Sequence, residues 1–78
     1  MTAFEDRVRR IVRETMEELD RDPDEIGDVV APPGAEYCLI RFRDDSLEPI
    51  EVSEGIGAGE SQEKDEVVRA LRYRLRIP

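Results

Sequence analysis

Glu36-Tyr37-Cys38-Leu39-Ile40-Arg41-Phe42-Arg43 is a segment in which apolar and polar residues alternate, and residues 47–54, LEPIEVSE, repeat the alternation. A period of two residues is typical of β-strands that bury one face. The positions expected to face the core carry no charge: Cys38, Ile40, Phe42, Ile50 and Val52. The opposite face of the first strand carries Tyr37, Leu39, Arg41 and Arg43.

The residues around these two strands predict the turns and one further strand. Asp44-Asp45-Ser46 forms the connecting turn, and the strand after it begins just past Pro49, which has no N–H to donate. We expect a loop over 24–28 and a short strand over 28–31. Pro33 and Gly34 then suit the second and third positions of a type II turn. The product is a three-stranded antiparallel meander.

Two amphipathic helices flank the strands. A capping box of Thr2 and Glu5 opens a helix over residues 3–21, which Pro23 ends by restricting the residue before it. Its apolar face recurs at helical spacing and comprises Phe4, Val8, Ile11, Val12, Thr15 and Leu19. Ser61 is expected to cap a second helix over 62–76. The apolar face of this helix comprises Val67, Val68, Leu71 and Leu75.

These elements predict one small α+β domain over residues 1–78, with the order α-β-β-β-α and both helices on one face of the sheet. A chain of 78 residues buries only about 60–65% of the surface that its unfolded form exposes. Cys38 is the single cysteine and histidine is absent, so neither an internal disulfide nor a zinc site is expected. We expect no cofactor and no small-molecule substrate.

Charge is unevenly distributed along the chain. The formal net charge is −8, with 20 acidic and 12 basic residues, and Lys64 is the only lysine. The acids concentrate in residues 22–66, whereas residues 67–78 carry four arginines and no acid. Two interpretations stay open, an arginine-rich codon usage and a saline cytoplasm. No apolar window approaches the ~20 residues of a membrane span, and residues 1–7 lack a secretory signal. We therefore expect a cytoplasmic protein.

No residue pattern predicts catalysis. The glycines at 55, 57 and 59 precede a helix, as in phosphate-binding loops, but acids surround them and no P-loop lysine follows, which favours a plain linker. Paired acids, such as Asp44 with Asp45 and Glu63 with Asp65 and Glu66, are expected on a solvated surface. Cys38 is expected in the core, with no histidine to activate it. The protein is therefore predicted not to be an enzyme.

The order of elements, together with Gly55, Gly57, Ser61 and the pair Ala70-Leu71, resembles the double-stranded RNA-binding domain. The resemblance covers about a quarter of the chain and implies a similar topology. That family carries a lysine pair after the serine to grip phosphates, whereas Gln62 and Glu63 stand there. Because phosphate contacts dominate nucleic-acid affinity, the family's binding mode does not carry over.

Two surfaces remain as candidates for partners. The leading hypothesis is a protein-interaction module that self-associates, or binds an unknown protein, through the sheet face that carries Tyr37, Leu39, Arg41 and Arg43. The alternative is a weak RNA-binding module that uses the second helix. Its residues would be Arg69, Arg72, Tyr73, Arg74 and Arg76. The competing interpretation of these arginines is that they complement the helix C-terminus and pair with the many carboxylates.

Overall fold

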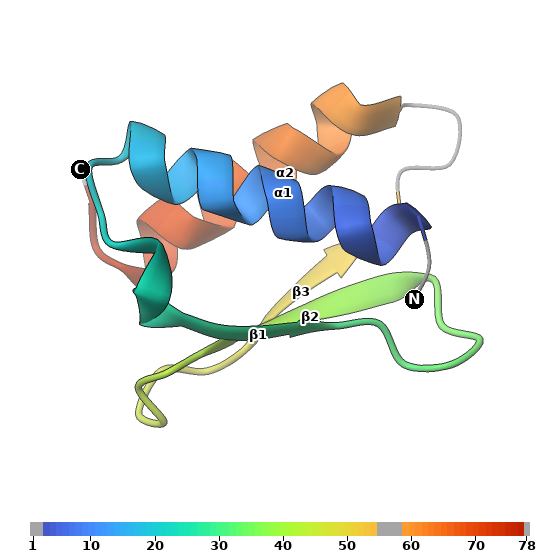
Figure 1. The fold of residues 1–78 in the computed structure, drawn as a ribbon, viewed down its shortest axis with the longest axis horizontal. Helices are drawn as coiled ribbons and strands as arrows, with labels where there is room; N and C mark the ends of the chain where they lie inside the picture. Colours follow the sequence, from blue (N-terminus) through green and yellow to red (C-terminus); the bar gives the residue numbers. More distant parts are fainter. Residues whose placement is uncertain (1–2, 55–58, 78) are drawn as a thin grey trace.

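The computed structural model describes residues 3–54 and 59–77, and its elements follow the predicted α-β-β-β-α order. They are α1 (Ala3–Glu18), the 3-10 helix η1 (Pro23–Glu25), β1 (Ile26–Val30), β2 (Tyr37–Phe42), β3 (Ile50–Ser53) and α2 (Gly59–Arg74). The strands form one antiparallel sheet in the order β1-β2-β3, with β2 in the centre. Figure 1 shows both helices side by side on the same face of this open sheet. The expected α+β fold with one layer of helices is confirmed.

The core lies between the helical layer and the inward face of the sheet. The predicted strand positions are all buried, and Cys38, Ile40 and Val52 have no exposed surface. The helices and β1 contribute Phe4, Val8, Ile11, Val12, Met16, Val29, Val67 and Leu71. Thr15 is also buried, and its hydroxyl has no hydrogen-bond partner among the described atoms. The two-residue period therefore assigns the inward face of β2 and β3 correctly. The helical period is correct for most of its positions, but Leu19, Val68 and Leu75 are only half-buried, and the buried Met16 was not predicted.

The first helix ends three residues earlier than predicted. Asp20 adopts a left-handed conformation (φ 59°), the Arg21 N–H donates to the Met16 carbonyl at 2.8 Å, and the Asp20 N–H donates to the Glu17 carbonyl at 3.1 Å. These bonds form a Schellman cap, which satisfies the last carbonyls of the helix. The end is therefore set by this cap, ahead of Pro23.

The second helix begins at Gly59 and ends at Arg74, whereas the sequence analysis placed it at 62–76. Ser61 therefore lies inside the helix, and its assignment as the N-cap was wrong. A second Schellman cap ends α2, with Arg76 at φ 55° and the Ile77 N–H donating to the Arg72 carbonyl at 2.9 Å. The glycine segment 55–58 and Thr2 of the expected capping box lie outside the described residues.

The first strand is longer than expected. It begins at Ile26, directly after η1, so the loop expected over 24–28 was wrong. A β-bulge at Gly27 shifts the register between Ile26 and Asp28 against β2. The Pro33-Gly34 turn is confirmed: Gly34 has φ 75°, and the Ala35 N–H donates to the Pro32 carbonyl at 3.1 Å.

Candidate interaction surface

The face of the sheet away from the helices carries an apolar strip between charges. The strand register aligns Val30, Leu39 and Glu51 across the three strands, and places Asp28 beside Arg41. Val30 and Leu39 are half-buried, while the three charged residues are exposed. The strip is therefore partly shielded by the side chains around it.

The four residues predicted for this surface lie at one face, but they differ in exposure. Tyr37 and Leu39 are half-buried, and Arg41 is exposed between them and the end of β2. Arg43 is exposed just beyond that end. Neither helix covers these positions, because both lie on the other face of the sheet (Figure 1).

The hydrogen-bond pattern shows which main-chain groups point away from the sheet at its two edges. The Glu54 N–H donates to the Glu36 carbonyl, and the Arg43 N–H donates to the Glu25 carbonyl. Because hydrogen-bonded and non-hydrogen-bonded pairs alternate along antiparallel strands, the main-chain groups of Val29 face outward on β1. Those of Ser53 face outward on β3 by the same alternation.

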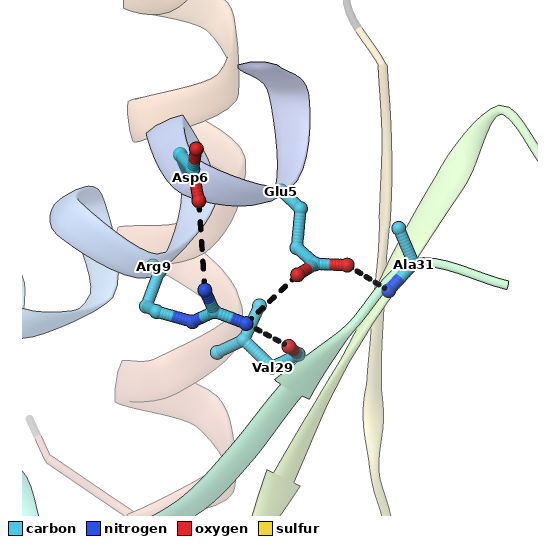
Figure 2. A network of polar contacts seen from close by, with 5 residues as sticks. All are labelled: Glu5, Asp6, Arg9, Val29 and Ala31. Atoms are coloured by element: carbon cyan, nitrogen blue, oxygen red, sulfur yellow. Dashed lines mark hydrogen bonds and ion pairs between the residues drawn. The ribbon is translucent and has the colours of Figure 1, made fainter. Parts of the chain in front are cut away.

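On the β1 edge, an acid and an arginine of α1 occupy these outward groups (Figure 2). The Arg9 Nη2 donates to the Val29 carbonyl at 2.9 Å, and a Glu5 carboxylate oxygen accepts from the Ala31 N–H at 3.0 Å. Arg9 and Glu5 also bond to each other at 2.9 Å. The Ala31 N–H, aided by Arg9, lowers the pKa of Glu5, so this carboxylate stays ionised.

On the β3 edge, α2 supplies a second acid and a second arginine. The Glu66 carboxylate accepts from the Ser53 N–H at 3.3 Å. Arg74 donates from Nε to the Glu48 carbonyl at 3.1 Å and from Nη2 to the Pro49 carbonyl at 3.3 Å. Each helix thus places one carboxylate on an edge N–H and one guanidinium on an edge carbonyl. We call these four side chains, Glu5, Arg9, Glu66 and Arg74, the edge caps.

The edge caps restrict where the sheet can take another strand. An edge strand presents unpaired N–H and C=O groups, which are a template for pairing with a further chain. In the described part of the chain, part of this template on each edge already has a charged partner. The open face is the side of the sheet that no element of the described fold occupies.

The structure also contains an ion pair in the core that the sequence analysis missed. Arg7 donates from Nε to one Glu63 carboxylate oxygen at 2.9 Å and from Nη2 to the other at 3.0 Å. The Glu63 side chain is 1% exposed and that of Arg7 is 33% exposed. Glu63 was expected on a solvated acidic surface, and that expectation is wrong. The hydrogen bonds with Glu63 raise the pKa of Arg7. The Glu54 carboxylate is a second ion-pair partner, with its Oε2 3.9 Å from the Arg7 Nη2.

Cys38 has no exposed surface, and burial raises the pKa of its thiol to about 11. At neutral pH the thiol is therefore protonated and enclosed, which suits packing and opposes nucleophilic chemistry. Within residues 3–54 and 59–77, no three or more histidine, cysteine or acidic side chains are arranged to hold a metal ion. Asp44 and Asp45 are exposed, and the Ser46 hydroxyl lowers the pKa of Asp44 through a 2.7 Å hydrogen bond.

The residues of the alternative nucleic-acid surface separate into two groups. Arg74 is half-buried and holds the β3 edge. Arg69, Arg72 and Arg76 are exposed, and Tyr73 between them is 77% exposed. Arg69, Arg72 and Tyr73 follow the spacing of one solvent-facing stripe of α2, whereas Arg76 lies beyond the helix end, in the left-handed position of its cap.

The residues of the open face could be predicted from sequence patterns, but the edge caps could not. Alternation in β2 identifies which side chains face away from the core. Glu5 and Arg9 are visible only as a pair four residues apart in a helix, and nothing in that spacing names Val29 or Ala31 as their partners. Nothing in the sequence around Glu66 or Arg74 indicates that these residues contact the edge of β3.

No family model matches this chain, and neither the curated proteins nor the solved structures contain one detectably similar to it. None of the helices in the described residues is both long and apolar enough to span a lipid bilayer.

Proposed function

We propose that this protein is a non-catalytic interaction module that associates with a second copy of itself through the open sheet face. The observation that carries the proposal is a set of three half-buried apolar residues, Val30, Tyr37 and Leu39, on the sheet face that neither helix covers. Such a strip invites a partner, because burying it removes apolar surface from water. The caps at both edges leave the face as the direct route for contact.

Charge complementarity favours a second copy as the partner. The strip is bordered by acids, Asp28 and Glu51, and by the cations Arg41 and Arg43. A twofold arrangement brings one patch against the same patch of the other copy. Turning the second face against the first allows the arginines of each copy to meet the acids of the other, so a surface of mixed sign complements itself.

The size of the face predicts weak and transient association. Strands lie about 4.8 Å apart and rise about 3.3 Å per residue, so three short strands offer on the order of 200–300 Å² of flat area per copy. Stable interfaces bury about 800 Å² per partner. We therefore expect a dissociation constant of roughly 100 µM to 1 mM, and a tighter one at salt concentrations that screen the net negative charge.

Sedimentation velocity over about 10 µM to 1 mM protein tests this range of affinity. The wild-type chain is expected to shift toward dimer as concentration rises. Tyr37→Gln and Leu39→Gln should abolish the shift, because they replace apolar contacts by groups that prefer water. Tyr73→Gln is the matched control, since it makes the same change at an exposed tyrosine of α2. A wild-type chain that stays monomeric at every concentration refutes the proposal, and so does a Tyr37→Gln variant that behaves like the control.

The second candidate, weak RNA binding, rests on the exposed stripe of Arg69, Arg72, Tyr73 and Arg76. An aromatic ring between cations can stack on a base while the cations contact phosphates. The acidic net charge opposes such binding, so the expected affinity is low and falls steeply with salt. Fluorescence anisotropy with single-stranded RNA at low salt tests it. Binding that Tyr73→Gln does not weaken, or no binding at all, removes this candidate.

A further inference from the structure

The β1 edge combines an outward strand template with a pair of side chains placed over it. Val29 turns its N–H and C=O away from β2, and Arg9 occupies only the carbonyl. The next outward group, the Ala31 N–H, is held by Glu5. Arg9 and Glu5 also bond to each other, which links the side chains that hold these two main-chain groups (Figure 2).

A groove continues along the same edge. It lies between α1 and β1 and has a volume of about 290 Å³. Its lining is mixed: Val12, Ile26 and Val29 are apolar, whereas Arg9, Arg13, Asp24 and Asp28 are charged. Gly27, at the bulge in β1, also lines the groove. Arg9 lines this groove and also donates to the Val29 carbonyl, so the same side chain borders the groove and holds the edge of β1.

We infer that β1 is a strand-pairing surface for β1 of a second copy, and that the Glu5–Arg9 pair keeps this surface closed. Opening the pair leads to a dimer in which the two sheets join edge to edge. This interface uses main-chain groups at the sheet edge, so it does not depend on the open-face association proposed above.

The register supports a second copy as the occupant. Once Arg9 has left the Val29 carbonyl, an antiparallel twofold at Val29 pairs the outward N–H and C=O of each Val29 with those of the other. The two Val29 side chains then face each other on the core side, a favourable contact between β-branched residues. Asp28 lies opposite Val30 of the other copy, so no like charges are directly opposed. The residues at the ends of the paired stretch, Gly27 and Ala31, are small and fit beneath α1.

The test removes the two edge caps on β1, Glu5 and Arg9. It does so in a chain whose open sheet face carries substitutions that prevent association through that face. In a Tyr37→Gln/Leu39→Gln chain, Glu5→Ala and Arg9→Ala together should raise the dimer association constant at least about tenfold, measured by sedimentation velocity. The control is Arg10→Ala with Glu14→Ala, which removes another ion pair four residues apart on the exposed side of the same helix. Both changes leave the net charge unaltered.

A third substitution identifies the interface. Val29→Pro removes an N–H that faces outward, so the β1–β2 ladder keeps its bonds while β1–β1 pairing loses one on each side. This change should return the cap-free chain to monomer. Far-UV circular dichroism confirms that each variant folds. If the double cap variant does not fold, Arg9→Leu alone, which exposes only the Val29 carbonyl, is measured against Arg10→Leu.

Three outcomes would overturn the inference. The first is a cap-free chain that stays as monomeric as its control. The second is association that Val29→Pro leaves intact, because pairing then does not use this edge. The third is open-ended polymer in place of a closed dimer, because that shows β1 pairing with a different edge.

Discussion

Replacing Arg7 by methionine should destabilise the fold strongly, because it removes the guanidinium that donates to both oxygens of the buried Glu63 carboxylate. Both oxygens of Glu63 lose a charge-assisted hydrogen bond, at 2.9 and 3.0 Å. Breaking a buried ion pair by removing one partner costs about 3–5 kcal/mol. Because the Arg7 side chain is 33% exposed, water offsets part of this loss, and we expect about 3 kcal/mol.

That loss is large for a domain of this size. A chain of 78 residues has a total stability of roughly 4–12 kcal/mol. A loss of about 3 kcal/mol lowers the midpoint of thermal unfolding by roughly 12–24 °C. Urea and thermal unfolding followed by circular dichroism at pH 7 measure both quantities.

Two further variants make the reasoning refutable. Arg10→Met is the matched control, because the Arg10–Glu14 pair is 3.9 Å long and about half-exposed, and its loss should cost less than about 0.5 kcal/mol. Arg7→Met combined with Glu63→Leu should restore most of the stability, since the buried charge is gone. The reasoning fails if Arg7→Met is no worse than the control, or if the double variant is as unstable as Arg7→Met alone.

Four other predictions follow from the backbone and the buried thiol. Arg76→Gly should raise the stability by about 0.5–1 kcal/mol in urea unfolding, because glycine adopts the left-handed conformation without strain. Gly34→Ala should lower it by about 1 kcal/mol through its positive φ alone, since no atom lies within 4 Å of the added Cβ. Gly27→Ala meets the Arg43 main-chain nitrogen at 3.3 Å instead, so its loss should come from a shift of the β1–β2 pairing that amide exchange of Arg43 detects. Cys38 should resist thiol reagents in the native state at pH 8 and react on unfolding. The folded pKa of Cys38, about 11, lies above its unfolded value. The protonated thiol therefore stabilises the folded state at neutral pH, and this stabilisation is lost as pH rises from 9 toward 11.

The faces of the elements could be predicted from sequence because each obeys a short period. Alternation in β2 correctly places Cys38 and Ile40 in the core and Arg41 outside it. Every inward position of the two predicted strands is apolar, so no choice between faces was ambiguous.

Glu63 could not be placed from its own helix. It lies four residues before Val67, which lies four before Leu71, so it continues the buried stripe of α2. An acid this close to the start of a helix is normally expected to face solvent and to complement the helix dipole, so its place on the buried stripe is easily overlooked. Only the position of Arg7, which belongs to the other helix, makes its burial favourable.

The helix ends and the edge caps could not be predicted from sequence, for related reasons. Both Schellman caps place a residue other than glycine, Asp20 and Arg76, in the left-handed conformation, so the usual glycine signal is missing. The caps on β1 and β3 join helix side chains to main-chain atoms, which carry no sequence identity. Side-chain patterns cannot report a partner of that kind.

The pairing of Arg7 with Glu63 also bears on how the chain folds as it is made. The two residues are 56 positions apart, so a nascent chain that stops short of residue 63 holds a guanidinium with no neutralising carboxylate from α2. In such a chain the residues of α1 and of all three strands have already been translated, but α2, one of the two helices that cover the sheet, is incomplete. Contacts this distant in sequence slow folding, because a long loop must close before they form. We therefore expect folding to complete only once α2 has left the ribosome, and truncated chains to be degraded by proteases.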